Sequence, residues 1–178
     1  MRRVMRSVVL GGVLVLAAAS SASAQRPFLF LGGGASIPVG DFADFAKTGW
    51  IIQGGFGVPV GPSGLSVGGT AFYGSNKHDF PAGTEDKTKI MAGLADLSYN
   101  FSPAARVSPY VLGGVGILTR DFEPAVGASE SETKFAYSGA LGLTIRVGAR
   151  AGLWLEGRFL GSGDTKLLPL NGGFYIEL

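Results

Sequence analysis

The stretch KFAYSGALGLTIRV, residues 134–147, contains the most regular pattern in the chain. Alternate positions hold mostly large apolar side chains such as Leu141 and Ile145, and the positions between them hold small or polar ones such as Ser138 and Arg146. A period of two predicts an extended strand with one apolar face. An ordinary strand has about five or six residues, whereas a tilted strand that crosses a bilayer needs about nine to eleven. The stretch therefore predicts one strand of a small transmembrane barrel.

Seven further segments show strand-like patterns, so that eight strands are predicted in total. Most alternate apolar residues with small, polar or charged ones, but residues 26–37 are apolar on both faces and leave their register open. The eight predicted strands are residues 26–37, 49–60, 65–75, 88–101, 109–119, 134–147, 152–160 and 170–178.

The connections between these strands alternate in length. Transmembrane barrels have short periplasmic turns and longer outside loops, whereas a soluble sandwich has no reason to keep this order. The sequence thus predicts an all-β fold, an eight-stranded antiparallel up-and-down transmembrane β-barrel with both termini on the periplasmic side. The long connections are residues 38–48, 76–87, 120–133 and 161–168, and the short ones are 61–64, 102–108 and 148–151.

The first 24 residues have the features of a cleavable signal peptide for the general secretory route. Three arginines precede an apolar core at residues 8–19, and Ala22-Ser23-Ala24 supplies small residues for cleavage. The core is short for a membrane anchor, which needs about twenty residues. We therefore expect a signal peptide at residues 1–24 and one barrel domain at residues 25–178.

Composition excludes several classes of protein. Removing the three arginines of the signal from 15 basic residues leaves 12 against 13 acidic ones, a net charge of −1, so no nucleic-acid partner is expected. The chain has no cysteine, which excludes disulfides, and its 30 glycines show no collagen-like period. Glycine within strands suits the tight curvature and close packing of a small barrel.

The size of an eight-stranded barrel favours an outward apolar face, because its interior is just wide enough for side chains. A lipocalin-like barrel with the apolar face inward would be overcrowded. We expect a lumen charge network on the other face, in which both signs are paired, since unpaired buried charges are costly. The expected lipid-facing residues are Leu141, Leu143, Ile145, Leu153, Leu155 and Phe159, and the expected network is Asp96, Arg146, Glu156, Arg158 and Glu177.

Aromatic residues gather near the strand ends, as in the two interfacial girdles of membrane barrels. Those expected near the long loops are Trp50, Tyr73, Phe135 and Tyr137, and those expected near the short turns are Phe28, Tyr99, Phe101, Tyr110 and Tyr175.

With these features, the chain resembles the small outer-membrane β-barrel family of the OmpA-transmembrane and OmpX-like kind. The resemblance rests on the strand pattern, on the run PYVLGGVG at residues 109–116 and on the last strand. It implies that Asn171, Gly173, Ile176 and Leu178 form a signal read by the outer-membrane assembly machinery, although Leu178 replaces the usual terminal aromatic residue. It further implies periplasmic chaperones, outer-membrane lipid and lipopolysaccharide as partners, and a monomer in the outer membrane.

The resemblance favours a non-enzymatic protein that holds four loops at the cell surface, with an adhesion or envelope-stability role and no cofactor. A competing hypothesis is an enzyme that modifies lipid, like the lipid A deacylases, in which His78 would act with a serine such as Ser75. The family does not settle this, but a catalytic histidine needs an orienting partner on a rigid element. A narrow small-solute channel and a secreted lipid carrier are also compatible with the sequence.

Two further patterns do not match the ligand sites that they resemble. The spacing of the loop acids matches no calcium loop, so no metal is expected. The run Gly32-Gly33-Gly34 is followed by neither Lys-Ser/Thr nor a helix, which excludes a phosphate-binding loop. The loop acids are Asp41, Asp44, Glu123, Glu130 and Glu132.

Overall fold

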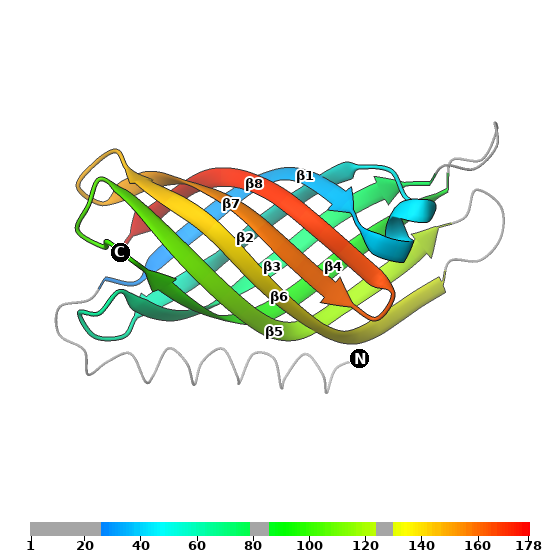
Figure 1. Ribbon diagram of the computed structural model, residues 1–178, viewed down its shortest axis with the longest axis horizontal. Coiled ribbons are helices and arrows are strands. Elements are labelled where there is room, and N and C mark those ends of the chain that lie inside the picture. Colours follow the sequence, from blue (N-terminus) through cyan, green and yellow to red (C-terminus); the bar gives the residue numbers. More distant parts are fainter. Residues whose placement is uncertain (1–25, 79–85, 124–129) are drawn as a thin grey trace.

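The computed structural model describes residues 26–78, 86–123 and 130–178. Eight antiparallel strands pair in chain order, and β8 pairs with β1 to close the barrel (Figure 1). This confirms the predicted fold class. The predicted signal peptide lies outside the described residues. Among the residues that are described, no helix has the length and apolar character needed to cross a membrane.

The strands are close to their predicted positions, although β5 and β6 are longer than expected. The elements are β1 (Phe28–Pro38), the 3-10 helix η2 (Gly40–Asp44), β2 (Gly49–Pro59), β3 (Leu65–Lys77), β4 (Lys87–Asn100), β5 (Val107–Glu123), β6 (Glu130–Arg146), β7 (Ala151–Ser162) and β8 (Thr165–Glu177).

Two predicted loops were wrong in extent. Much of the expected loop at residues 120–133 is strand, because β5 and β6 remain paired as far as Phe122 and Glu130. The expected loop at residues 161–168 is a tight turn instead, in which Gly163 and Asp164 join β7 to β8. Gly163 has a φ of 54°, which glycine adopts without strain. The four connections at this end of the barrel therefore have ten, nine, six and two residues, so two of them are long rather than four.

Side chains alternate between the outer surface and the lumen along every strand, as the pleat requires. The outer surface carries most of the large apolar side chains, including Leu141, which is 68% exposed. The lumen holds a mixture of buried apolar, polar and charged residues. The β-sheet thus turns an apolar band outward around a filled interior.

The lumen contains three layers, which follow one another along β7 from the short-turn end. Trp154 belongs to an aromatic layer, Glu156 and Arg158 to an ionic layer, and Leu160 to an apolar layer. The apolar layer corrects the expectation that small and ionic side chains fill the middle, because large side chains occupy the half nearer the long connections. Its strand residues include Ile51, Phe72, Ile90, Leu118, Leu160 and Leu167.

Helix η2 closes the barrel at the end with the long connections (Figure 1). Phe42, in the middle of this helix, is fully buried and joins the apolar layer. The segment is held by Asn76 of β3, whose Nδ2 donates hydrogen bonds to the carbonyl oxygens of Ser36, at 3.0 Å, and Lys47, at 2.8 Å. Residues 38–48, expected to be a polar loop, thus form an inward plug in which Phe42 packs edge to face with Phe45.

Candidate functional site in the barrel lumen

The centre of the lumen holds a buried ion cluster, formed by β4 and β7. Arg158 is 0% exposed, and its Nε donates a hydrogen bond to Glu156 Oε1 at 2.9 Å. Its Nη1 lies 3.4 Å from Asp96 Oδ1 on the opposite wall. Glu156 and Arg158 are two residues apart in β7, so the pleat points both side chains into the lumen. One guanidinium therefore bridges two carboxylates.

Neutral side chains complete the ionic layer. Glu156 accepts hydrogen bonds from Gln53 Nε2 at 3.2 Å and from the hydroxyl of Tyr110 at 2.9 Å. Gln53 in turn accepts a hydrogen bond from Asn171 Nδ2 at 2.9 Å, and Thr70 donates one to Asp96. The cluster thus connects β2, β3, β4, β5, β7 and β8 across the barrel.

On the side of the cluster nearer the long connections, the apolar layer replaces the polar side chains of the lumen. The guanidinium carbon of Arg158 lies 5.0 Å from the centroid of the Phe72 ring, a cation–π contact. Phe72 is buried and packs in the same apolar cluster as Phe42 of the plug. Large apolar side chains therefore fill the lumen on this side of the ion cluster.

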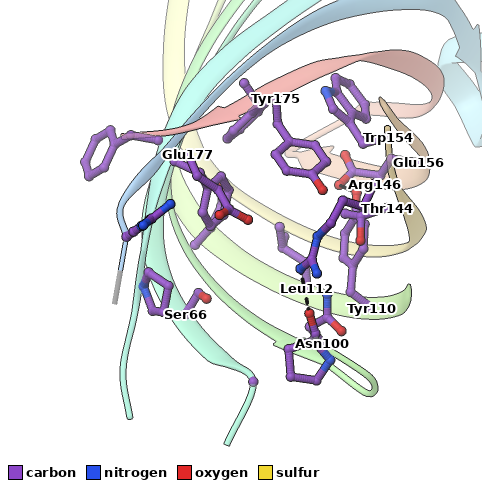
Figure 2. A pocket seen from close by; sticks show the side chains of 18 of the residues that line it. Ser66, Asn100, Tyr110, Leu112, Thr144, Arg146, Trp154, Glu156, Tyr175 and Glu177 are labelled. Atoms are coloured by element: carbon purple, nitrogen blue, oxygen red, sulfur yellow. Dashed lines mark hydrogen bonds between the residues drawn. The ribbon is translucent and has the colours of Figure 1, made fainter. Parts of the chain in front are cut away.

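On the other side of the cluster, a cavity of about 310 Å³ opens among the short turns (Figure 2). Its mouth includes Pro62 of the β2–β3 turn and Pro103 of the β4–β5 turn, and its deep end includes Asp96, Glu156 and Arg158. The walls are the aromatic layer, which consists of Phe28, Phe30, Tyr110, Trp154 and Tyr175.

Glycines make room for this aromatic layer. The Phe30 and Trp154 rings meet edge to face with centroids 6.0 Å apart. Each ring of the layer lies over a glycine of a nearby strand, where any side chain would collide with it. The pairs are Phe28 over Gly57, Phe30 over Gly55, Tyr110 over Gly142, Trp154 over Gly32 and Tyr175 over Gly152.

The aromatic girdle expected at the short-turn end was therefore wrong for Phe28, Tyr110 and Tyr175, which line the lumen. Tyr99 and Phe101 are exposed on the outer surface and pack together with centroids 5.2 Å apart. An aromatic residue near a strand end gives the same sequence signal whether it points inward or outward. A glycine beneath the ring does not by itself give the direction, because the exposed ring of Tyr137 also lies over a glycine, Gly161.

Of the five residues expected in the charge network, the structure brings together Asp96, Glu156 and Arg158. The other two lie at the mouth of the cavity (Figure 2). Arg146 donates a hydrogen bond from Nη2 to the carbonyl oxygen of Pro103 at 2.9 Å, which spans β6 and the β4–β5 turn. Glu177 comes from the last strand. Both lie near the short-turn ends of their strands, away from the level of the cluster.

The residues expected to face lipid lie on the outer surface. Leu141, Leu143, Leu153 and Leu155 are exposed there, and Ile145 and Phe159 are partly covered by their neighbours. Phe159 packs on Tyr137, with ring centroids 6.1 Å apart. Their contact with lipid remains a prediction.

The residues of the expected assembly signal divide between the two faces of β8. Asn171 points into the lumen towards Gln53, and Gly173 pairs with Trp154 of β7 at a position where a side chain would collide with the β1 backbone at Leu31 and Gly32. Ile176 and Leu178 are exposed on the outer surface. Asn171 and Gly173 thus have structural roles in the lumen, and recognition by assembly machinery remains a prediction.

His78 lies at the rim beside the plug, where the enzyme hypothesis would need a serine. Its Nε2 lies 2.7 Å from Oγ1 of Thr88, which is buried, and its ring lies between Phe45 and Phe122. Ser75 shares the outward-facing positions of β3, whereas its neighbour Asn76 points inward. His78 is thus packed between two aromatic rings and contacts the hydroxyl of a buried threonine, whereas Ser75 faces outward.

We expect the pKa of His78 to lie below its ordinary value of 6.5, because burial disfavours the charged ring and Arg120 repels it, outweighing the attraction of Asp86. Because the pKa is lowered in the folded state, packing of the neutral ring stabilises the fold fully above pH 6.5. This stabilisation is lost as the pH falls through the lowered pKa. The chain has one histidine, so its ring protons can be followed by NMR without assignment. A titration midpoint at or above 6.5 would contradict this packing.

Two of the five loop acids, Glu123 and Glu132, form ion pairs with neighbouring cations. Glu123 contacts Lys89 at 2.5 Å and Lys87 at 3.3 Å, and Glu132 contacts Lys134 at 3.0 Å and Arg120 at 3.5 Å. The hydrogen bond from Lys89 lowers the pKa of Glu123. Within the described residues, no three His, Cys, Asp or Glu side chains are grouped to hold a metal ion.

The solved structures that are similar to this chain include small outer-membrane barrels. Neisserial surface protein A (NspA) is 14% identical, with a TM-score of 0.64 over 85% of this chain and 97% of its own. The barrel domain of OprF from Pseudomonas aeruginosa is 10% identical, with a TM-score of 0.57 over 86% and 98%. Ail, the attachment invasion locus protein of Yersinia pestis, is 16% identical, with a TM-score of 0.55 over 85% and 97%. At these identities the similarity shows the fold.

The sequence itself assigns the family. None of the curated proteins matches the chain. Residues 8–169, however, match the sequence model of the family described as outer membrane protein beta-barrel domain. This match covers most of the chain and agrees with the closed eight-stranded barrel, so the protein belongs to the outer membrane protein beta-barrel domain family and resides in the outer membrane.

Proposed function

We propose that this protein is a non-enzymatic outer-membrane barrel that presents the β5–β6 hairpin for adhesion or for stability of the envelope. The observation that carries the proposal is the length of this hairpin. β5 and β6 have 17 residues each, against 11–14 in the other strands. A tilted strand needs only about nine to eleven residues to cross a bilayer, so the hairpin extends beyond the membrane.

The projecting part of the hairpin, residues 119–123 and 130–134, is polar and internally paired. Arg120 lies opposite Glu132 in the ladder and forms an ion pair with it, and the hydroxyls of Thr119 and Thr133 are 2.8 Å apart. Exposed ion pairs add little stability on their own. The continued backbone ladder nevertheless gives a regular two-stranded surface, which suits contact with a partner better than lipid.

The proteins of similar structure support a role at the cell surface. One is named a surface protein, and another is an attachment and invasion protein whose structure includes a heparin analogue. An enzymatic role has less support, because His78 has Thr88 as its hydroxyl partner and Thr88 is buried. The apolar layer that fills part of the lumen disfavours a channel, and the outer-membrane family disfavours a secreted carrier.

The proposal also includes how the barrel reaches the outer membrane and how it is oriented there. Its signal peptide would direct export by the general secretory route, and chaperones and the assembly machinery would insert it as a monomer. The outward apolar band would contact lipid, and the end with long connections would meet lipopolysaccharide, since longer loops of such barrels lie outside.

Shortening the hairpin tests the proposal. We would replace residues 120–132 with Asn-Gly, a strong hairpin turn, between Thr119 and Thr133, which already face each other. The barrel should still fold, as shown by unchanged migration of unboiled protein on a gel. Cell adherence, or survival in detergent, should fall to that of cells without the protein.

A matched control changes the short turn at the same end, replacing Gly163-Asp164 with Asn-Gly. This variant should retain both phenotypes, because it leaves the β5–β6 hairpin intact. If the shortened barrel folds, and adherence and detergent survival both equal those of the unaltered protein, the hairpin has no such role.

A further inference from the structure

The cavity in the aromatic layer has the features of a ligand site that faces the periplasm. Its volume of about 310 Å³ is at the lower end of the range for small-molecule pockets, which is about 300–1,000 Å³. It is closed at its deep end by the ionic layer and opens among the short turns. Such pockets combine apolar walls with a few convergent polar groups, and this cavity has both.

The charge at the deep end indicates what would bind. Asp96 and Glu156 are both bonded to Arg158, the one cation that pairs with either of them among the described residues. Two carboxylates and one guanidinium carry a net charge of −1 when all are ionised. Buried charge is costly unless it is compensated. A cation entering from the mouth would compensate it.

The walls indicate that the cation would be organic. The faces of aromatic rings attract cations, and aromatic cages recognise alkylated ammonium groups. Phe28, Phe30, Trp154 and Tyr175 line the cavity beside Tyr110, whose hydroxyl donates to Glu156 at 2.9 Å. A hydrated metal ion would gain little from these apolar walls, whereas an alkyl or aryl ammonium ion would contact both the rings and the carboxylates.

The mouth carries charges of both signs, because Arg26 lines it together with Arg146 and Glu177. Arg146 donates a hydrogen bond to the turn at Pro103, and Glu177 comes from β8 (Figure 2). The attraction for a cation therefore comes from the carboxylates and rings deeper in the cavity. We propose that the cavity binds a small organic cation, an amine or quaternary ammonium group with an apolar body, from the periplasmic side. This binding is independent of the proposed role of the β5–β6 hairpin at the other end.

Fluorescence of Trp154 provides the test. The chain has two tryptophans, and Trp50 lies exposed on the outer surface. In the Trp50→Phe variant, Trp154 alone reports on the cavity. The protein, in non-ionic detergent micelles, would be titrated with benzyltrimethylammonium, with the neutral benzyl alcohol and with the anion benzenesulfonate. We expect a saturable change in Trp154 emission with the cation, at concentrations at least about tenfold lower than with either other probe.

Two substitutions locate the binding. Glu156→Gln removes one negative charge while retaining the shape of the side chain, and should weaken cation binding about tenfold or more. Asp96→Asn serves the same purpose if the first variant fails to fold. Glu123→Gln is the matched control, because it removes one negative charge from the hairpin at the opposite end and should leave binding unchanged.

The titrations of the three probes on the otherwise unaltered protein decide the proposal even if neither lumen variant folds. Equal binding of the cation and the neutral probe, or no saturable change with the cation, would overturn it. So would equal loss of binding in Glu156→Gln and Glu123→Gln. A parallel titration with glycerophosphoethanolamine distinguishes a lipid headgroup from a free amine as the source of the cation, and saturable binding of either class supports the site.

Discussion

Replacing Arg158 with methionine is expected to lower the free energy of unfolding by about 3–5 kcal/mol, because it leaves two buried carboxylates without their cation. Arg158 is fully buried, bonds to both Glu156 and Asp96, and lies over the Phe72 ring. Methionine retains much of the apolar volume, so the loss reports on charge more than on packing. The measurement is urea-induced unfolding of the refolded barrel in micelles, followed by tryptophan emission.

Two controls separate the buried charge from a general effect of removing an arginine. Arg146→Met changes the same residue type at the mouth, where one hydrogen bond to Pro103 is lost, and should cost less than about 1 kcal/mol. The triple variant Asp96→Asn, Glu156→Gln and Arg158→Met removes all three charges and should recover most of the lost stability. Equal unfolding midpoints for Arg158→Met and Arg146→Met would show that the cluster does not stabilise the barrel.

The sequence was sufficient to predict the barrel because two of its signals come from the backbone. Alternation with a period of two follows from the pleat, and it identified strands such as residues 134–147 without knowledge of their partners. The order of long and short connections then gave the up-and-down topology. The turn at Gly163 was missed because residues 161–168 contain polar residues and glycines typical of loops, although β7 and β8 continue through them.

The contents of the lumen were less predictable, because they depend on the depth of each residue in the barrel. Arg146 and Arg158 share the inward face, yet only Arg158 is at the level of Asp96 and Glu156. Depth follows from the register between strands, which alternation alone does not give. The plug at Phe42 was missed for a related reason, since two aromatic residues, Phe42 and Phe45, in a short segment give no period to reveal which of them is buried.

Replacing Leu141 with arginine is expected to destabilise the barrel by about 2–4 kcal/mol, as found for basic residues at the middle of the bilayer on the lipid face of such barrels. Leu141 is 68% exposed and lies midway between Phe135 and Val147 along β6. In water, a charge at so exposed a position would cost almost nothing. The penalty therefore arises from lipid, and urea-induced unfolding of the barrel from liposomes measures it.

Val147→Arg is the matched control, because Val147 is 70% exposed on the same outward face but lies just beyond the end of β6. Near the interface, the same charge should cost only about 0–1 kcal/mol. The difference between the two variants depends on depth in the membrane, since their exposed fractions are nearly equal. If both variants unfold at the same urea concentration in liposomes, Leu141 does not face the hydrocarbon. The same pair compared in detergent micelles should show a smaller difference, because a micelle deforms around a charge more readily than a bilayer does.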